Sequence, residues 1–122
     1  MQDDALTVAR AYHRAWTTHN FEDAGRHLAD ALLVEVPINE YPTKAEFLRV
    51  VKLTREMATQ VEVLAEFGNA GEALLLYDMQ LPVTDLRVAE HLTLADGKIT
   101  RIRQIHDTAA LRAAGFGQVV IG

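Results

Sequence analysis

The sequence predicts an α+β fold, because helical and strand patterns occupy different parts of the chain. Apolar residues recur mainly at helical spacing over residues 4–57, interrupted by a single strand-like run. Four strand-like runs separated by short turns follow. Helices first and antiparallel strands last are typical of α+β domains rather than of alternating α/β domains.

Length and composition narrow the class of protein further. The chain has 122 residues, of which 49% are apolar, so we expect one folded domain spanning 1–122. The net charge is −5, and the basic residues are scattered, so a nucleic-acid partner is not expected. No apolar run approaches the roughly 20 residues of a membrane span. The start, MQDDALTV, lacks the basic and apolar regions of a signal peptide, which makes the cytoplasm the expected location.

Missing residue types exclude several chemistries. The sequence contains neither cysteine nor serine, which excludes thiolate and serine nucleophiles, disulfides and thiolate metal sites. There is no glycine-rich phosphate loop. No set of histidines and carboxylates has metal-ligand spacing, so we expect no metal and no cofactor.

Capping residues mark the predicted helices. A first helix should run from Asp4 to about His19, and Asn20 should cap a short second helix. The run ALLVEVP reads as a strand that Pro37 ends. Thr43 with Glu46 forms a capping box for a third helix. We expect that helix to bury an apolar face, which comprises Phe47, Val50, Val51, Thr54 and Met57.

The second half reads as a strand meander. Its runs are QVEVLAEF, EALLLYDMQL, RVAEHLTL and KITRIRQI, the last two joined at Asp96-Gly97. Asp107 or Thr108 can cap a short helix, TAALRAA, which Gly115 ends. The apolar tail FGQVVIG, residues 116–122, is expected to dock on the body or on a partner chain.

The direction of Glu90 depends on the hairpin register. A two-residue turn would pair Glu90 with Arg103 and leave both faces of the hairpin mixed. A three-residue loop with a bulge would pair Glu90 with Ile102 and place Ile99 on a mainly polar opposite face. The cleaner separation favours the bulged register, in which Glu90, Gln104 and His106 point to the apolar side. A buried carboxylate has a raised pKa and is a candidate for acid–base chemistry, although a hydrogen-bonded core residue is an alternative.

The segments ARAYHRAWTTHNFED, LADALLVEVP and DGKITRIRQIHDTAALRAAG resemble the SnoaL-like branch of the nuclear transport factor 2-like superfamily. Ketosteroid isomerases, limonene epoxide hydrolases and polyketide cyclases share that fold. The resemblance implies a cone-shaped curved antiparallel sheet wrapped around N-terminal helices with an apolar pocket. It also implies a homodimer that packs through the outer sheet face.

Carried over by residue, the isomerase comparison places the catalytic tyrosine on Tyr12 and the oxyanion-binding acid on Glu90. The isomerase general base falls on Val36, and the adjacent Glu35 should point away from the pocket. The aspartate that epoxide hydrolases carry in the last strand falls on Gln104, whose amide cannot ionise.

Other side chains complete the predicted site. His106 is a candidate proton carrier near the pocket mouth. The expected catalytic residues are therefore Glu90, Tyr12, His106 and Gln104. Contacts with the ligand are expected from Trp16, Val36, Tyr41, Phe47 and Tyr77. His13, His27 and His91 read as surface residues.

Three functions fit this pattern. The first is a cofactor-independent enzyme of isomerase, cyclase or hydrolase type that acts on a small, largely apolar molecule. The second is a non-catalytic ligand-binding module with the same pocket. The third is a dimeric structural domain whose own side chains fill the pocket.

Overall fold

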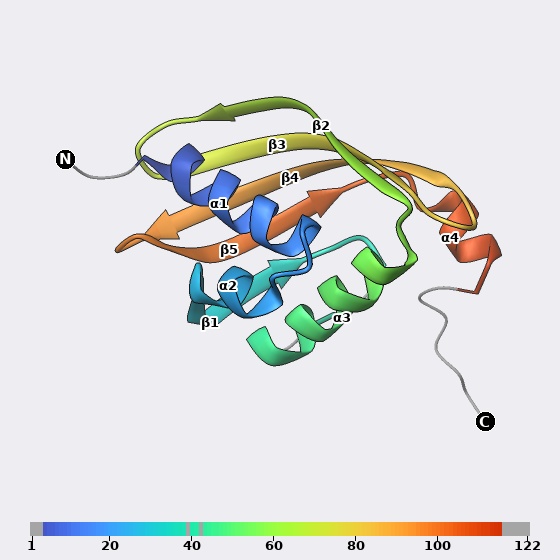
Figure 1. The fold of residues 1–122 in the computed structure, drawn as a ribbon, viewed down its shortest axis with the longest axis horizontal. Helices are drawn as coiled ribbons and strands as arrows, with labels where there is room; N and C mark the ends of the chain where they lie inside the picture. Colours follow the sequence, from blue (N-terminus) through green and yellow to red (C-terminus); the bar gives the residue numbers. More distant parts are fainter. Residues whose placement is uncertain (1–3, 39, 42, 116–122) are drawn as a thin grey trace.

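A computed structural model describes residues 4–38, 40–41 and 43–115 of the chain. One curved sheet wraps around helices that lie along its concave face (Figure 1). The helices are α1 (Ala5–Thr17), α2 (Phe21–Arg26), α3 (Lys44–Met57) and α4 (Ala109–Ala113). The strands are β1 (Leu28–Glu35), β2 (Gln60–Gly68), β3 (Glu72–Gln80), β4 (Asp85–Ala95) and β5 (Lys98–Ile105). The α+β fold class and the curved sheet are confirmed, whereas the apolar tail lies outside the described residues.

The predicted caps start the first three helices. The side chain of Asp4 accepts a hydrogen bond from the amide of Thr7, and Asn20 accepts one from Asp23. Thr43 accepts a bond from the amide of Glu46, as a capping box requires. No helix in the described ranges is long and apolar enough to cross a membrane.

The sheet combines a meander with one parallel edge strand. Its order is β1-β5-β4-β3-β2, and consecutive strands from β2 to β5 are antiparallel. β1 instead runs parallel to β5, which the sequence did not predict. The chain leaves β1 for α3 and returns only at the opposite edge, so β1 has no hairpin partner.

The hairpin register differs from both sequence alternatives. The turn has two residues, Asp96 and Gly97, whose φ angles of 53° and 77° are those of a type I′ turn. The bulge lies in β5, beyond the turn, and not within it. Thr93 pairs with Arg101 and Leu94 with Ile99, which leaves Thr100 as the extra residue.

This bulge decides which side chains point inward. Glu90 pairs with Gln104, so the predicted pairing with Ile102 was wrong by two residues. Because side chains alternate with a period of two, a two-residue error leaves Glu90 on the predicted inner face. Ile99, however, was assigned to the wrong face: it lies before the bulge and is buried opposite Leu94.

α1 supplies the helical half of the core. Its buried residues are Ala5, Val8, Ala9, Tyr12, His13, Ala15 and Trp16. His13 was predicted at the surface, and that prediction was wrong because position 13 lies one turn from both Ala9 and Trp16.

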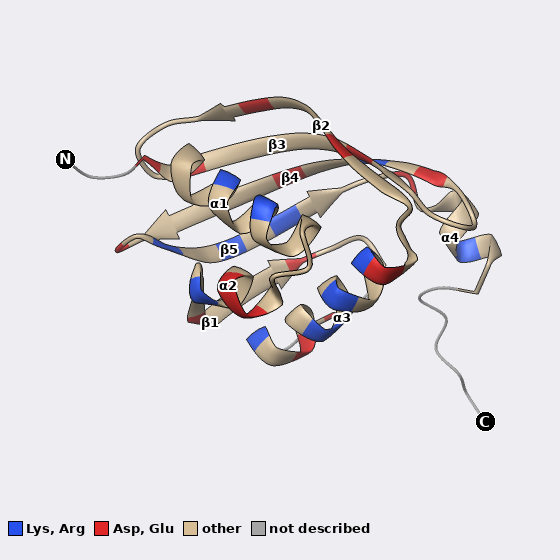
Figure 2. Ribbon diagram, viewed as in Figure 1, with Lys and Arg blue, Asp and Glu red and all other residues tan. Residues whose placement is uncertain are grey.

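α3 is less buried than its sequence predicts. Only Phe47 is fully buried, and Leu53 and Met57 are 47% and 41% exposed. Charged residues of both signs also lie along this helix (Figure 2). The apolar face of α3 therefore borders a cavity, and the helix contacts the sheet at β1.

Candidate active site

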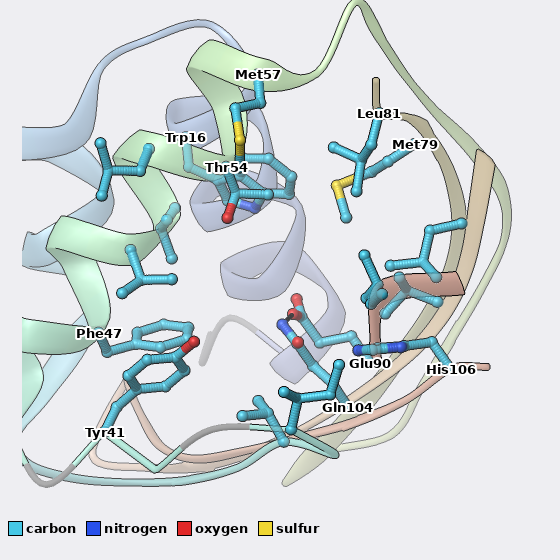
Figure 3. A pocket seen from close by; sticks show the side chains of 18 of the residues that line it. Trp16, Tyr41, Phe47, Thr54, Met57, Met79, Leu81, Glu90, Gln104 and His106 are labelled. Atoms are coloured by element: carbon cyan, nitrogen blue, oxygen red, sulfur yellow. Dashed lines mark hydrogen bonds between the residues drawn. The ribbon is translucent and has the colours of Figure 1, made fainter. Parts of the chain in front are cut away.

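A cavity of about 560 Å³ lies between the concave face of the sheet and helices α1 and α3 (Figure 3). All nine predicted site residues lie on its wall. They are Tyr12, Trp16, Val36, Tyr41, Phe47, Tyr77, Glu90, Gln104 and His106. Met79 and Val88 extend the wall on the inward strand faces, and the sequence did not single out its remaining leucines, Leu81, Leu86 and Leu111.

Glu90 is the buried charged group of this cavity. The residue is 1% exposed and occupies the inner face of β4, directly opposite Gln104 of β5. The amide nitrogen of Gln104 donates a hydrogen bond of 2.6 Å to Oε2 of Glu90. The hydroxyl of Tyr77 donates a second bond to the same oxygen, at 3.3 Å. The other oxygen, Oε1, is buried without a hydrogen-bond partner among the described residues.

Burial raises the pKa of Glu90 to about 7. Removal from water disfavours the carboxylate, and this effect exceeds the opposing stabilisation by Gln104 and Tyr77. The acid and the carboxylate are therefore both populated near neutral pH, which is the condition for a general acid or base.

Two buried tyrosines surround the carboxyl group. Burial, together with the negative charge of Glu90, raises the pKa of both Tyr12 and Tyr77 well above the usual value. Both phenols remain protonated at neutral pH and can serve as hydrogen-bond donors. Tyr77 already donates to Glu90, whereas Tyr12 faces the cavity from α1.

The position of the isomerase base holds no acid. Val36 lies on the cavity wall, and the adjacent Glu35 is on the opposite face, 3.4 Å from the guanidinium of Arg103. Glu40 and Glu46 also border the cavity, but both are exposed. Glu90 is thus the one fully buried carboxyl group among the described wall residues.

The remaining candidates lie around the carboxyl group. His106 is partly buried, and its Nδ1 lies 3.0 Å from the carbonyl oxygen of Asp107. Tyr41 and Phe47 form an aromatic pair, with ring centroids 5.9 Å apart, on the wall facing Glu90 (Figure 3). Within the described ranges, no three histidine or carboxylate side chains come together as a metal-ligand set.

His13 lies behind Tyr77, outside the cavity wall. Its ring contacts those of Tyr77 and Trp16, with centroid distances of 5.0 and 5.1 Å. Its Nδ1 has no hydrogen-bond partner among the described residues, and burial lowers the pKa of the imidazole to about 4. His13 is therefore a neutral packing residue that touches the site from behind.

A curved sheet that closes over helices around an apolar cavity defines the nuclear transport factor 2-like architecture. Residues 9–102 match the SnoaL-like domain family, and the chain belongs to this family. No curated protein matches the chain.

Solved structures extend this similarity. A protein from Kribbella flavida DSM 17836 is 37% identical, with 93% of this chain and 94% of that chain covered and a TM-score of 0.84. A nuclear transport factor 2-like protein of unknown function from Cytophaga hutchinsonii ATCC 33406 is 16% identical over 91% and 97% of the chains, with a TM-score of 0.79. A steroid delta-isomerase from Pseudomonas aeruginosa is 12% identical, with 94% of this chain and 88% of that chain covered and a TM-score of 0.77. At these low identities the last two comparisons show the fold alone.

Proposed function

We propose that this protein is a cofactor-independent acid–base enzyme that moves a proton on a small, largely apolar molecule bound in the cavity. The observation that carries the proposal is Glu90, a 1% exposed carboxyl group whose Oε1 has no partner among the described residues and whose pKa is about 7. An ionisable group with these properties is most useful where a ligand supplies the missing partner.

The wall residues suggest a role for each group. The ionised Glu90 takes a proton from carbon, and the resulting acid returns it at another position. The hydroxyl of Tyr12 donates a hydrogen bond to a carbonyl or hydroxyl oxygen of the same molecule. Trp16, Phe47 and Tyr41 hold the apolar part and exclude water.

The chemistry differs from that of a site with two carboxyl groups. Val36 cannot act as a base, and the amide of Gln104 cannot ionise. In this proposal Glu90 both removes and returns the proton, which favours an isomerisation over a hydrolysis that needs separate acid and base.

Hydrogen exchange at carbon tests this proposal without the natural substrate. We expect the protein to accelerate deuterium uptake from D₂O at the carbon atoms next to the carbonyl group of 2-tetralone, an apolar bicyclic ketone. Proton NMR measures this uptake as the loss of the corresponding proton signals. The rate should rise with pH through about 7 as Glu90 becomes ionised. Glu90→Gln should reduce the accelerated rate by about 100-fold or more, because the amide cannot accept the proton.

Glu56→Gln is the matched control, since Glu56 lies exposed on α3 and outside the cavity wall. Equal exchange rates for Glu90→Gln and the unchanged protein would refute the role of Glu90. Saturable binding of 2-tetralone with no accelerated exchange would support the second function, a ligand-binding module. The open cavity argues against the third, a structural domain with a filled pocket.

We further propose that two copies associate through the outer sheet face. Phe67 and Ile105 point to that face and are 65% and 73% exposed, which is unusual for large apolar side chains. Leu74 pairs with Phe67 and extends the apolar surface along β3.

Charge placed on this face should separate the copies. Phe67→Glu and Ile105→Glu are each expected to reduce the mass measured by light scattering from that of two 13.6 kDa chains to that of one. Leu53→Glu adds the same charge on α3 and should leave the dimer intact. A monomeric unchanged protein would contradict the proposal.

A further inference from the structure

The two oxygens of the Glu90 carboxyl group have different surroundings. Oε2 accepts hydrogen bonds from both Gln104 and Tyr77, whereas Oε1 is buried with no partner among the described residues. In Figure 3 the carboxyl group of Glu90 and the amide of Gln104 lie together and project into the cavity. Only Oε1 is therefore left for a ligand.

The strand register produces this asymmetry. Leu75, Glu90 and Gln104 form one row across the inner face, and Tyr77 is the next inward residue of β3. The phenol thus reaches Glu90 diagonally from one neighbouring strand, and the amide reaches it directly from the other.

The ring of Tyr77 is held in place from behind. Tyr77 is 2% exposed, and its ring contacts those of His13 and Trp16 at centroid distances of 5.0 and 6.0 Å. These ring contacts come from α1. The phenol oxygen therefore has a fixed position relative to Oε2, which is what a residue that orients another group requires.

We propose that Tyr77 is a positioning residue that acts with Gln104 to hold Oε2 of Glu90, so that the carboxyl group exchanges protons with the ligand through Oε1 alone. This inference rests on the proposed function of Glu90. Two donors occupy the acceptor positions of Oε2, so the proton of the neutral acid resides on Oε1. Tyr77 then sets the direction of the transfer without touching the ligand's reacting atoms.

Removal of either donor should raise the pKa of Glu90, because each hydrogen bond stabilises the carboxylate. Tyr77→Phe retains the ring and its contacts, and Gln104→Met retains the side-chain length. A hydrogen bond to a charged group corresponds to about one pKa unit, and the longer Tyr77 bond should contribute less than the Gln104 bond. The measurement is a pH titration of the Glu90 side-chain carboxyl by carbon-13 NMR, assigned with Glu90→Gln.

Gln60→Met is the matched control, because Gln60 is exposed on β2 and outside the cavity wall, and this change should leave the titration of Glu90 unmoved. The pH dependence of 2-tetralone exchange should shift to higher pH by the same amount as the titration. A Glu90 pKa that stays within about 0.2 units in both donor variants would overturn the inference, since a packing role alone would not move it. The titration needs no turnover, so it remains decisive even if Glu90→Gln keeps full exchange and the proposed function fails.

Discussion

Glu90→Gln is expected to stabilise the protein above pH 7 by about 3 kcal/mol relative to the unchanged chain. The pKa of Glu90 is about 7 in the folded protein, compared with 4.5 for the free side chain. Between these values the folded state binds more protons than the unfolded state, so stability falls as pH rises. The loss is complete above pH 7 and absent below about 4.5, where both states are protonated.

The amide in Glu90→Gln mimics the neutral acid. Its oxygen can accept the bonds from Gln104 and Tyr77, and its nitrogen takes the place of Oε1 beside the cavity. Urea unfolding followed by circular dichroism should therefore give nearly equal stabilities at pH 4.5 and a growing advantage for the variant up to pH 8. Glu56→Gln, on the exposed side of α3, should show no such trend.

A destabilising carboxyl group is informative about function. If Glu90→Gln gains stability and loses proton exchange together, the free energy lost in burying the charge is linked to the activity. If the variant gains no stability at pH 8, Glu90 is better solvated than its 1% exposure implies, and the proposed function loses its main support.

The inward direction of Glu90 could be predicted because a strand residue keeps its face when the pairing shifts by an even number of residues. The sequence pattern therefore had to distinguish only odd from even shifts. Both the predicted pairing with Ile102 and the actual pairing with Gln104 place Glu90 inside. The caps at Asp4, Asn20 and Thr43 were equally accessible, because each depends on residues within one helical turn.

Features that depend on distant packing were not predictable. Because the bulge lies at Thr100, Ile99 points to the inner face and not to the predicted outer face. The neighbouring sequence does not distinguish a bulge at this position from one within the turn. The face of α3 has core-like spacing, yet it borders a cavity that only the curvature of the sheet creates. The burial of His13 had a signal in its spacing from Ala9 and Trp16, but the polarity of imidazole suggested the opposite.

His13→Phe is expected to remove the contribution by which His13 lowers stability on acidification. Burial lowers the pKa of His13 from 6.5 to about 4, and the negative charge of Glu66 opposes this by a smaller amount. Between these values the unfolded state binds more protons, so His13 decreases stability as pH falls from 6.5 to 4. The total is about 3 kcal/mol, and the variant should not lose it, because a phenyl ring does not titrate and can still pack against Trp16 and Tyr77.

The two linkages have opposite signs over the same range. From pH 4.5 to 6.5, rising pH stabilises through His13 and destabilises through Glu90, so the unchanged protein should show little net dependence from these two groups. Each single variant should expose the slope of the remaining group: His13→Phe should lose stability with rising pH, and Glu90→Gln should gain it. His19→Asn alters an exposed histidine at a φ of 65° that asparagine tolerates, and it should leave the profile unchanged. Parallel profiles for His13→Phe and the unchanged protein would mean that the imidazole can be protonated without leaving its site beside Tyr77.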